Sequence, residues 1–364
     1  MTRPIAISDS ANFYVSAERI FDPTLKNVPV IVLSNNDRCA VARSDEAKAL
    51  GIKMGEPLHL LRDKIEAHGI RVFSSNYTLY GDISRRVVEV YEDYSPSVEI
   101  YSIDECFLDF SGFKDRTAHA KALRRDVLRR VGVPVRVGIA PTKTLAKCAN
   151  DIAKKNPIFA GVLDMMDDTL ANWLLPLVPV GDIWGIGRKT QAKLHGVGIG
   201  TAAELRDMPL RQARALGTVV LERTVLELQG EPCIAFDDVE PQRKGMAVTR
   251  SSGTPMKDFD TVFEAITAHA TRAAEKLRRS CENTDWWQGQ LPSSSTPIAI
   301  AKTDPSMRDP DRPGSPRCRP IPSIWLRPPR DVPWRPGRRS VQINTGLRRP
   351  VSCSTICCPL TNGR

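Results

Sequence analysis

The chain has 364 residues and a formal net charge of +10, which favours a polyanionic partner such as a nucleic acid. No apolar run approaches membrane-spanning length, and the chain starts without the pattern of a signal peptide, so the composition argues against a membrane or secreted protein. Its nine cysteines lack paired C-x-x-C spacing, which excludes a typical structural zinc site and predicts a reduced, cytoplasmic protein.

Strands and helices are predicted to alternate through the first 163 residues. Apolar runs predict strands over residues 5–8, 28–33, 98–101, 106–110 and 135–139. Helical periodicity predicts helices over residues 13–20, 45–50, 80–94, 118–130 and 142–155. This order predicts an α+β fold in which helices pack on a largely antiparallel sheet.

Three carboxylates follow the ends of two of these strands. Asp9 follows the first apolar run, and Asp104 and Glu105 lie in the sequence S-I-D-E that follows residues 98–101. If the two strands are neighbours, the three acids converge on one sheet edge, where their mutual repulsion needs a cation. Oxygen ligands of this kind suit Mg²⁺. The alternative is that Asp104 and Glu105 only open a polar turn.

Residues 164–232 are predicted to be helical and contain the sequence W-G-I-G-R-K-T at residues 184–190. Gly185 and Gly187 allow a tight turn, and the next helix would begin near Arg188 and Lys189. A helix–hairpin–helix of this type presents backbone amides to a DNA phosphate without reading base sequence. The alternative is an ordinary glycine turn between two helices.

A further domain begins near residue 244, with a strand followed by a helix over residues 261–279. The C-terminal tail, residues 280–364, then holds 14 of the 28 prolines, and 12 of its 13 basic residues are Arg. Proline removes backbone donors, so the tail is expected to be disordered. We interpret the abrupt change as a reading-frame shift near codon 280; the alternative is a genuine basic tail.

Several motifs resemble Y-family (translesion) DNA polymerases. The first motif and the catalytic palm motif of that family resemble residues 9–18 and 101–105. Three more segments look like the UmuC branch, the catalytic subunit of DNA polymerase V: residues 34–37, 46–51 and 73–77. The motifs occur in family order, and the resemblance covers residues 1 to about 279.

The resemblance implies a right-hand polymerase with a ferredoxin-like palm, small fingers, a helical thumb with the helix–hairpin–helix, and a truncated little finger. The implied boundaries are palm 1–12 and 80–163, fingers 13–79, thumb 164–232, linker 233–243, partial little finger 244–279 and disordered tail 280–364.

The implied activity is error-prone, template-directed DNA synthesis across lesions in the SOS response, with two Mg²⁺ ions. By resemblance, Asp9 and Asp104 would bridge both metal ions, Glu105 would complete the primer-side site, and the backbone carbonyl of Ser10 would assist. Asp109, in the next strand, is interpreted as structural.

Substrate contacts are also implied by the resemblance. Lys154 matches the triphosphate-contacting lysine, and Lys48 stands where other members have an arginine. Tyr14 matches the steric gate beneath the sugar, while its neighbour Phe13 has packing as its simpler role. Asp45 replaces a tyrosine of other branches, which puts a second triphosphate contact in doubt.

Lys143 and Lys147 complete a basic stripe with Lys154, because the three lie within about 40° of one another on a helix. The alternative is a solvated helix face. The usual Asn-Ala order of the first motif is inverted here, at Ala11 and Asn12.

The expected DNA contacts are Gly185, Gly187, Arg188 and Lys189 of the thumb, and Arg250 of the little finger. The expected partners are primer–template DNA and a dNTP, with the UmuD′ dimer and RecA added by resemblance; no membrane is expected. No sliding-clamp peptide is recognised in the tail. Two other readings stay open: a catalytically impaired DNA-binding remnant, and a two-metal nuclease or cyclase-like enzyme.

Overall fold

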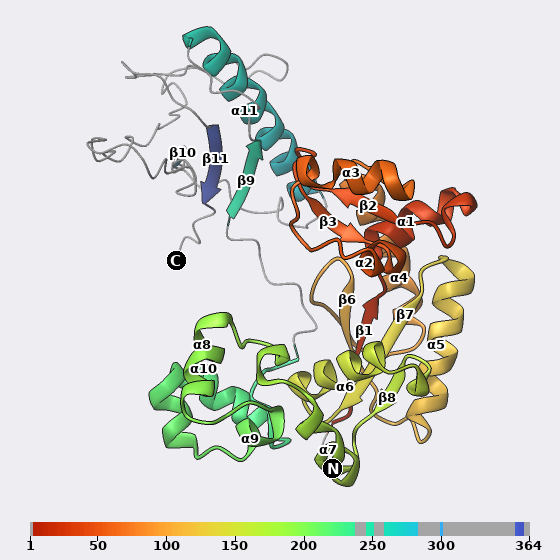
Figure 1. Ribbon diagram of the computed structural model, residues 1–364, viewed down its shortest axis with the longest axis vertical. Helices are drawn as coiled ribbons and strands as arrows, with labels where there is room; N and C mark the ends of the chain where they lie inside the picture. Colours follow the sequence, from red (N-terminus) through yellow and green to blue (C-terminus); the bar gives the residue numbers. More distant parts are fainter. Residues whose placement is uncertain (1–2, 237–244, 251–257, 283–298, 301–353, 360–364) are drawn as a thin grey trace. The chain divides into compact units, whose positions relative to one another are not determined.

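The computed structural model describes residues 3–236, 245–250, 258–282, 299–300 and 354–359 (Figure 1). The chain divides into two compact units, Met1–Glu240 and Pro241–Arg364, and the division falls within the segment expected to be a linker. In the described ranges, no helix is both long and apolar enough to cross a membrane.

The centre of the first unit is a five-stranded sheet in the order β5-β6-β1-β7-β8. Its strands are β1 (Ile5–Ser10), β5 (Val98–Ile100), β6 (Glu105–Asp109), β7 (Val135–Ala140) and β8 (Val162–Asp164). All neighbouring pairs are antiparallel except β7 and β8, as the predicted largely antiparallel α+β fold requires.

Side-chain alternation along β1 divides the core between the two faces of this sheet. Ile5 and Ile7 pack against α6 (Lys143–Lys155), whereas Ala6 belongs to the cluster on the opposite face. The opposite face is covered by α1 (Phe13–Phe21), α4 (Tyr77–Glu92) and α5 (Arg116–Arg130) (Figure 1). The acidic end of β1 therefore lies on the face that carries α6.

The five predicted strands and five predicted helices are all present, and most boundaries agree within three residues. β8 was not predicted from the sequence, and neither were three elements of the predicted fingers. The latter are β3 (Ala40–Arg43), α3 (Leu58–His68) and β4 (Arg71–Phe73). With β2 (Val30–Leu33), β3 and β4 form a separate sheet in the order β3-β2-β4, and α2 (Asp45–Ala49) follows β3.

Residues after β8 are helical, as predicted. The helices are α7 (Asp168–Leu174), α8 (Arg188–Gly196), α9 (Ala202–Arg206) and α10 (Leu210–Leu228), with short 3-10 turns between α7 and α8. Non-helical backbone at Gly217 and Thr218 kinks α10. Apolar residues of all four helices join one core cluster with α6, so the helical region packs directly on the helix above the acids.

Two features hold α6 in place against the sheet. At Gly138 of β7, an added Cβ would lie 2.3 Å from both the Ala146 carbonyl oxygen and the Asn150 amide nitrogen of α6. At the start of α6, the buried carboxylate of Glu227 accepts a hydrogen bond from the Thr144 amide at 3.0 Å. Glu227 also accepts from the Cys233 amide at 2.7 Å, which joins α6 to the segment after α10.

Among its described residues, the second unit has a three-stranded sheet in the order β10-β11-β9 and one long helix. These elements are β9 (Gly245–Arg250), α11 (Phe259–Glu282), β10 (Ala299–Ile300) and β11 (Ser354–Pro359). The strand and helix predicted between residues 244 and 279 are β9 and α11. The proline-rich composition did not predict β10 and β11, which are short β-branched or apolar segments; the rest of the tail lies outside the described residues.

Candidate active site

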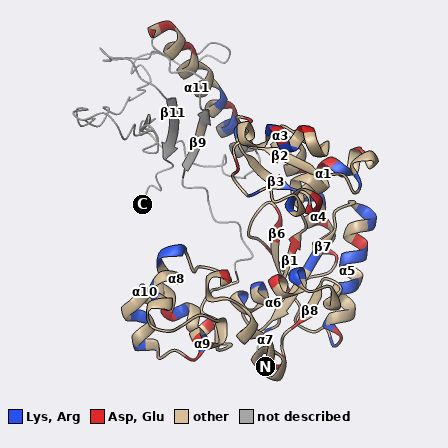
Figure 2. Cartoon of the chain, in the orientation of Figure 1, with Lys and Arg blue, Asp and Glu red and all other residues tan. Residues whose placement is uncertain are grey.

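Three acids meet at the end of the central sheet. In the antiparallel pairing of β1 with β6, Asp9 lies directly opposite Glu105, and the Ser10 amide donates to the Asp104 carbonyl oxygen at 2.8 Å. The expected neighbours, the strand before Asp9 and the strand over residues 98–101, are β1 and β5, and β6 lies between them, so that expectation is wrong. The acids still converge, because Glu105 begins β6, which pairs directly with β1. Figure 2 shows the acidic residues of β1 and β6 beside the basic residues of α6.

Burial and like charges shift the protonation of these acids. Burial raises the pKa of Asp9, and the nearby Asp104 charge raises it further, while the Lys154 ammonium opposes both effects. Burial likewise raises the pKa of Glu105, against a lowering hydrogen bond from Lys147. The acids are thus held close together in a site that disfavours their negative charge, which is the condition in which a bound cation is most stabilising.

Each of the three carboxylates has a partner within the site. Lys147 Nζ lies 2.9 Å from Glu105 Oε2, Lys154 Nζ lies 3.6 Å from Asp9 Oδ2, and Ser102 Oγ donates to Asp104 Oδ1 at 2.6 Å. With these contacts made, no three acidic, histidine or cysteine side chains of the described residues form a metal-binding group. The donor chemistry nevertheless fits a hard divalent cation, because all the candidate ligand atoms are oxygens.

The prediction of a basic stripe on α6 is wrong for one of its three lysines. Lys143 is 1% exposed, and its ammonium lies 2.5 Å from a Glu99 oxygen, so it forms a buried ion pair and does not face a substrate. Lys147 contacts Glu105, and only Lys154 keeps an open side chain beside Asp9, with 43% of it exposed. Helical spacing predicted the shared direction of these lysines, but it could not predict that Glu99 covers one end of the stripe.

Lys147 also joins the acids to the segment before α8. Its ammonium lies 4.5 Å from the Tyr101 ring centroid and 5.3 Å from that of Trp184. Trp184 Nε1 donates to Tyr101 Oη at 3.1 Å, and the two rings meet edge to face. Cation–π contacts with two rings hold the Lys147 side chain at Glu105 and tie the start of the hairpin to the palm motif.

Tyr14 and Phe13, at the start of α1, have different environments. Phe13 is 4% exposed within the core cluster, which favours packing over substrate contact. Tyr14 is only partly buried, and its ring stacks on Tyr80 with centroids 4.3 Å apart. Tyr80 Oη donates to Glu18 at 2.7 Å, and Tyr77 meets the Tyr14 ring edge to face. The candidate steric gate therefore rests on a fixed aromatic platform.

Lys48 is held between the fingers and the palm. Its ammonium donates to Asp45 Oδ1 at 2.8 Å and to the side-chain oxygen of Asn12. Asn12 has a left-handed backbone, with φ at 47°, a conformation that Asn tolerates better than Ala. The inverted order of Ala11 and Asn12 thus places an amide where it can bind Lys48, while Asp45 neutralises part of the charge of Lys48.

The glycine-rich turn leads into α8, as predicted. Gly185 has a φ of 88°, which requires glycine, and Gly187 is the residue before the first turn of α8, with nothing within 4 Å of an added Cβ. Arg188 and Lys189 are exposed at the start of that helix. The arrangement leaves the amino end of α8 open beside two cations.

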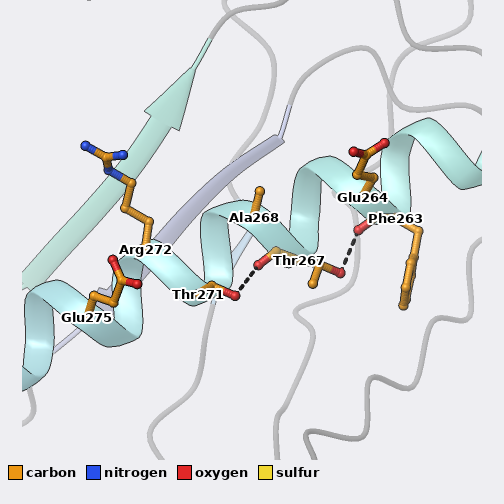
Figure 3. Close-up of a pocket in the computed structure, with 7 residues that line it drawn as sticks. All are labelled: Phe263, Glu264, Thr267, Ala268, Thr271, Arg272 and Glu275. Carbon is orange, nitrogen blue, oxygen red and sulfur yellow. Dashed lines mark hydrogen bonds between the residues drawn. The ribbon is translucent and has the colours of Figure 1, made fainter.

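In the second unit, Arg250 ends β9, opposite Ser354 of β11, and its side chain lies outside the described residues. A shallow groove follows α11 and is lined by residues of that helix alone (Figure 3). Thr267 and Thr271 donate to backbone carbonyls one turn earlier in the same helix. Both threonine hydroxyls are therefore used within the helix.

Two polar residues that lie beside the acids were not predicted from the sequence. Arg136 of β7 pairs directly with Asp9, and Asn150 of α6 hydrogen-bonds the Asp9 side chain. The signal for Arg136 was present, because it is the single charged residue in the strand sequence VRVGIA. Its relation to Asp9 required the register between β1 and β7.

Two family profiles match the chain. The profile of the impB/mucB/samB family matches residues 8–151, which include all three acids, and the profile of the family's HHH motif matches residues 167–199, which include the turn before α8. The matched segments contain every candidate site residue except Arg250 and Lys154.

Curated relatives support the same assignment. The chain is 45% identical to protein UmuC of Salmonella typhimurium over 277 residues and 42% identical to protein MucB of Escherichia coli over 276 residues. In both cases the match covers 75% of this chain and 66% of the relative's length, just under two thirds. DNA polymerase IV 2 of Bacillus subtilis is 34% identical over 57% of this chain and 51% of its own length.

Solved structures share the fold at low sequence identity. A Y-family DNA polymerase chimera of Dbh and Dpo4 aligns with a TM-score of 0.64 at 20% identity, over 75% of this chain and 80% of the chimera. The Dbh ternary complex aligns with a TM-score of 0.60 at 16% identity, over 98% of both chains. At these identities the likeness establishes the architecture of a Y-family polymerase and nothing finer.

Proposed function

The chain belongs to the impB/mucB/samB family, and from that membership and the geometry above we propose that it is a template-directed DNA polymerase for translesion synthesis. The observation that carries the proposal is the register of β1 and β6, which sets Asp9 opposite Glu105 with Asp104 one residue away. Three acids at one sheet edge, with raised pKa values for two of them, are suited to nucleotidyl transfer that depends on divalent cations.

In the proposed reaction, a primer 3′-hydroxyl attacks the α-phosphate of a dNTP, and pyrophosphate leaves. Asp9 and Asp104 would hold two Mg²⁺ ions, with Glu105 and the Ser10 carbonyl as further ligands. Bound there, the ions would supply activation of the attacking oxygen and charge stabilisation on the leaving phosphate. For Glu105 to act as a ligand, Lys147 must release it; Lys147 then remains beside the acids as a cation held by Tyr101 and Trp184.

The remaining residues are assigned to substrate binding. Lys154 and Lys48 would contact the triphosphate, and the Tyr14 ring would lie under the sugar. Arg188 and Lys189 would contact duplex phosphates together with the free amides that follow Gly187. Contacts of this kind bind DNA of any sequence, as copying an arbitrary template demands. Arg250 is retained as a little-finger contact.

Family membership also suggests the biological setting. Relatives named UmuC, ImpB, SamB and MucB are 42–45% identical to the chain, so we propose that it acts in error-prone synthesis during the SOS response, with UmuD′ and RecA as proposed partners. The second candidate is a DNA-binding remnant that keeps the palm but extends primers poorly. Binding without extension would identify it.

Primer extension across an abasic template site tests the proposal. The intact chain with Mg²⁺ and all four dNTPs should extend the primer past the lesion, and Asp104→Ala should reduce extension by a factor of about 10³ or more, because the ion-binding edge loses a central ligand. Binding of primer–template by Asp104→Ala, measured by fluorescence anisotropy, serves as the folding control.

Three results would contradict the polymerase assignment. Extension by Asp104→Ala at the level of the parent chain would remove the acids from the chemistry. DNA binding without extension by the parent chain would favour the remnant. Hydrolysis of DNA or dNTP without primer growth would favour a two-metal nuclease or cyclase-like enzyme.

A further inference from the structure

A row of charged residues crosses the sheet at the open end of β1. Glu105 of β6 lies opposite Asp9 of β1, and Asp9 lies opposite Arg136 of β7. Directly paired residues of antiparallel strands project from the same face of a sheet. Arg136 therefore belongs to the face that carries the acids and α6, two residues before the point where α6 contacts Gly138.

The guanidinium of Arg136 has a donor atom without a partner among the described residues. Its Nη1 atom is buried and has no hydrogen-bond partner among the described residues, and no salt bridge joins Arg136 to a carboxylate there. A buried donor without a partner is destabilising, because it has lost its hydrogen bonds to water without gaining others. The Nη1 donor of Arg136 is therefore available to a ligand that binds beside the acids.

Arg136 lies between the palm acids and the fingers. Burial raises the pKa of Asp9, and the charge of Arg136 opposes that rise. Against the effect of burial, Lys48 and Asn12 lower the pKa of Asp45, the first residue of α2, and Arg136 adds to the lowering. Asp45 is in turn paired with Lys48, and Asp9 with Lys154. Arg136 therefore acts on both carboxylates, each of which is paired with a lysine assigned to the triphosphate.

We propose that Arg136 is a phosphate-binding residue for the incoming nucleotide, and that it supplies the second triphosphate contact missing at position 45. This proposal rests on the proposed polymerase function and adds a residue to it. A guanidinium presents a planar fork of donors that matches two phosphate oxygens, whereas Lys48 and Lys154 act as point charges. Arg136 Nη1 would find its partner when the triphosphate binds.

The competing role for Arg136 is that of a counter-ion for Asp45. Among the described residues, Lys48 forms the salt bridge to Asp45, and a purely structural Arg136 would serve to offset the remaining charge of that carboxylate. The two roles differ in one consequence. A counter-ion becomes unnecessary once the Asp45 carboxylate is removed, whereas a phosphate ligand does not.

Two substitutions at this position separate charge from shape. Arg136→Gln removes the charge, and Arg136→Lys keeps it without the fork. We expect Arg136→Gln to raise the KM for dNTP by about 10-fold or more with a smaller change in kcat, and Arg136→Lys to fall between it and the parent chain. Arg129→Gln, an exposed arginine on α5, is the matched control and should keep the KM of the parent.

Direct binding gives a readout that does not depend on turnover. The dissociation constants of a dNTP and of its unphosphorylated deoxynucleoside are measured for each variant on the full chain with primer–template and Ca²⁺. Arg136→Gln should weaken dNTP binding about 10-fold and leave deoxynucleoside binding unchanged. Equal weakening of both ligands would overturn the proposal, because it would show a general loss of the site. Thermal melting of each variant reports whether it is folded.

The double variant Asp45→Asn/Arg136→Gln decides between the two roles. A phosphate ligand predicts that the double variant keeps the 10-fold loss relative to Asp45→Asn alone. Recovery of dNTP affinity in the double variant would show that Arg136 only offsets Asp45. If the parent chain fails to extend primers but Arg136→Gln still loses dNTP affinity selectively, the polymerase assignment fails and the phosphate site stands. If the parent chain extends primers and Arg136→Gln keeps the parent's KM for dNTP, the phosphate-binding role of Arg136 is wrong and the polymerase assignment stands.

Discussion

The ring of Tyr14 packs against the edge of a core cluster and is positioned by two other tyrosines. Tyr80 stacks on it from α4, and the Glu18 carboxylate holds the Tyr80 hydroxyl, which helps to raise the pKa of Tyr80 after the larger effect of burial. Tyr77 adds an edge contact. Because Tyr14 is only partly buried, its exposed side can contact a ligand while its position stays fixed.

Replacing Tyr14 with Ala should weaken the exclusion of ribonucleotides. A ring beneath the sugar collides with a 2′-hydroxyl, and removing it opens space for that group. We expect the ratio of kcat/KM for dNTP over rNTP to fall by about 10- to 100-fold, the range in which a shaped pocket discriminates one small group. Single-nucleotide insertion with matched dNTP and rNTP measures this ratio.

Tyr94→Ala is the matched control, since its hydroxyl binds Asp126 of α5 on the opposite side of the sheet from α6. It should leave sugar discrimination at the parent level. If Tyr14→Ala also leaves the ratio unchanged, Tyr14 is a packing residue of α1, and another group must exclude the ribose.

At the scale of elements, the site depends on how closely α6 approaches β7. Gly138 allows backbone contact between them, and α6 carries both Lys147 and Lys154 to the acids. Gly138→Ala inserts a methyl group where backbone atoms of α6 lie 2.3 Å away, so the helix must shift. We expect a loss of about 1–3 kcal/mol in the free energy of unfolding, with a fall in primer extension.

The control for this prediction is Gly81→Ala in α4. An alanine Cβ there meets nothing within 4 Å, and the residue is within a helix, so the substitution should raise the free energy of unfolding by about 0.5–1 kcal/mol. Urea unfolding of both variants makes the comparison. A Gly138→Ala chain as stable as Gly81→Ala would show that α6 can move without loss.

The elements that were predictable share a long, regular pattern. The apolar run before Asp9 and the periodic residues of α4 and α6 gave their positions within a few residues. By contrast β3, β4 and β8 have only three or four residues, which is too short for a two-residue period to stand out. They form because long-range partners exist: β4 and β8 each pair with a strand distant in sequence.

The candidate site was predictable in its residue types and less so in its contacts. The acids after two apolar runs indicated convergence, but the strand beside β1 is β6, which Glu105 begins, and not β5 as expected. No local pattern could show that Lys143 is buried against Glu99, which precedes it by 44 residues, or that Arg136 pairs with Asp9. Both facts depend on tertiary pairing, which a helical wheel or an apolar run does not contain.

At the scale of the molecule, the charge is unevenly distributed. Residues 280–364 carry 13 basic and 6 acidic residues, so residues 1–279 account for a net charge of only +3. Binding of DNA by the first unit must therefore use local groups of cations and free amides, and not a general positive field. The exposed pair Arg188 and Lys189, at the open amino end of α8, is such a group.

Substitution of this pair should weaken DNA binding in a salt-dependent way. Each phosphate contact that is lost removes about one unit from the slope of log affinity against log salt concentration. The double variant Arg188→Ala/Lys189→Ala is therefore expected to bind primer–template more weakly at all base sequences, with a slope reduced by about two. Anisotropy titrations of the full chain at several salt concentrations measure both quantities.

The matched control for this prediction is the double variant Arg85→Ala/Arg86→Ala. These two arginines are also adjacent and exposed on a helix, but both pair with Asp82 of α4 and neither follows a glycine turn. The chain loses the same formal charge in both double variants. If DNA affinity responds only to net charge, the two slopes fall equally, and the hairpin has no special role. A larger fall for Arg188 and Lys189 requires that their position at the start of α8 brings them to the phosphates.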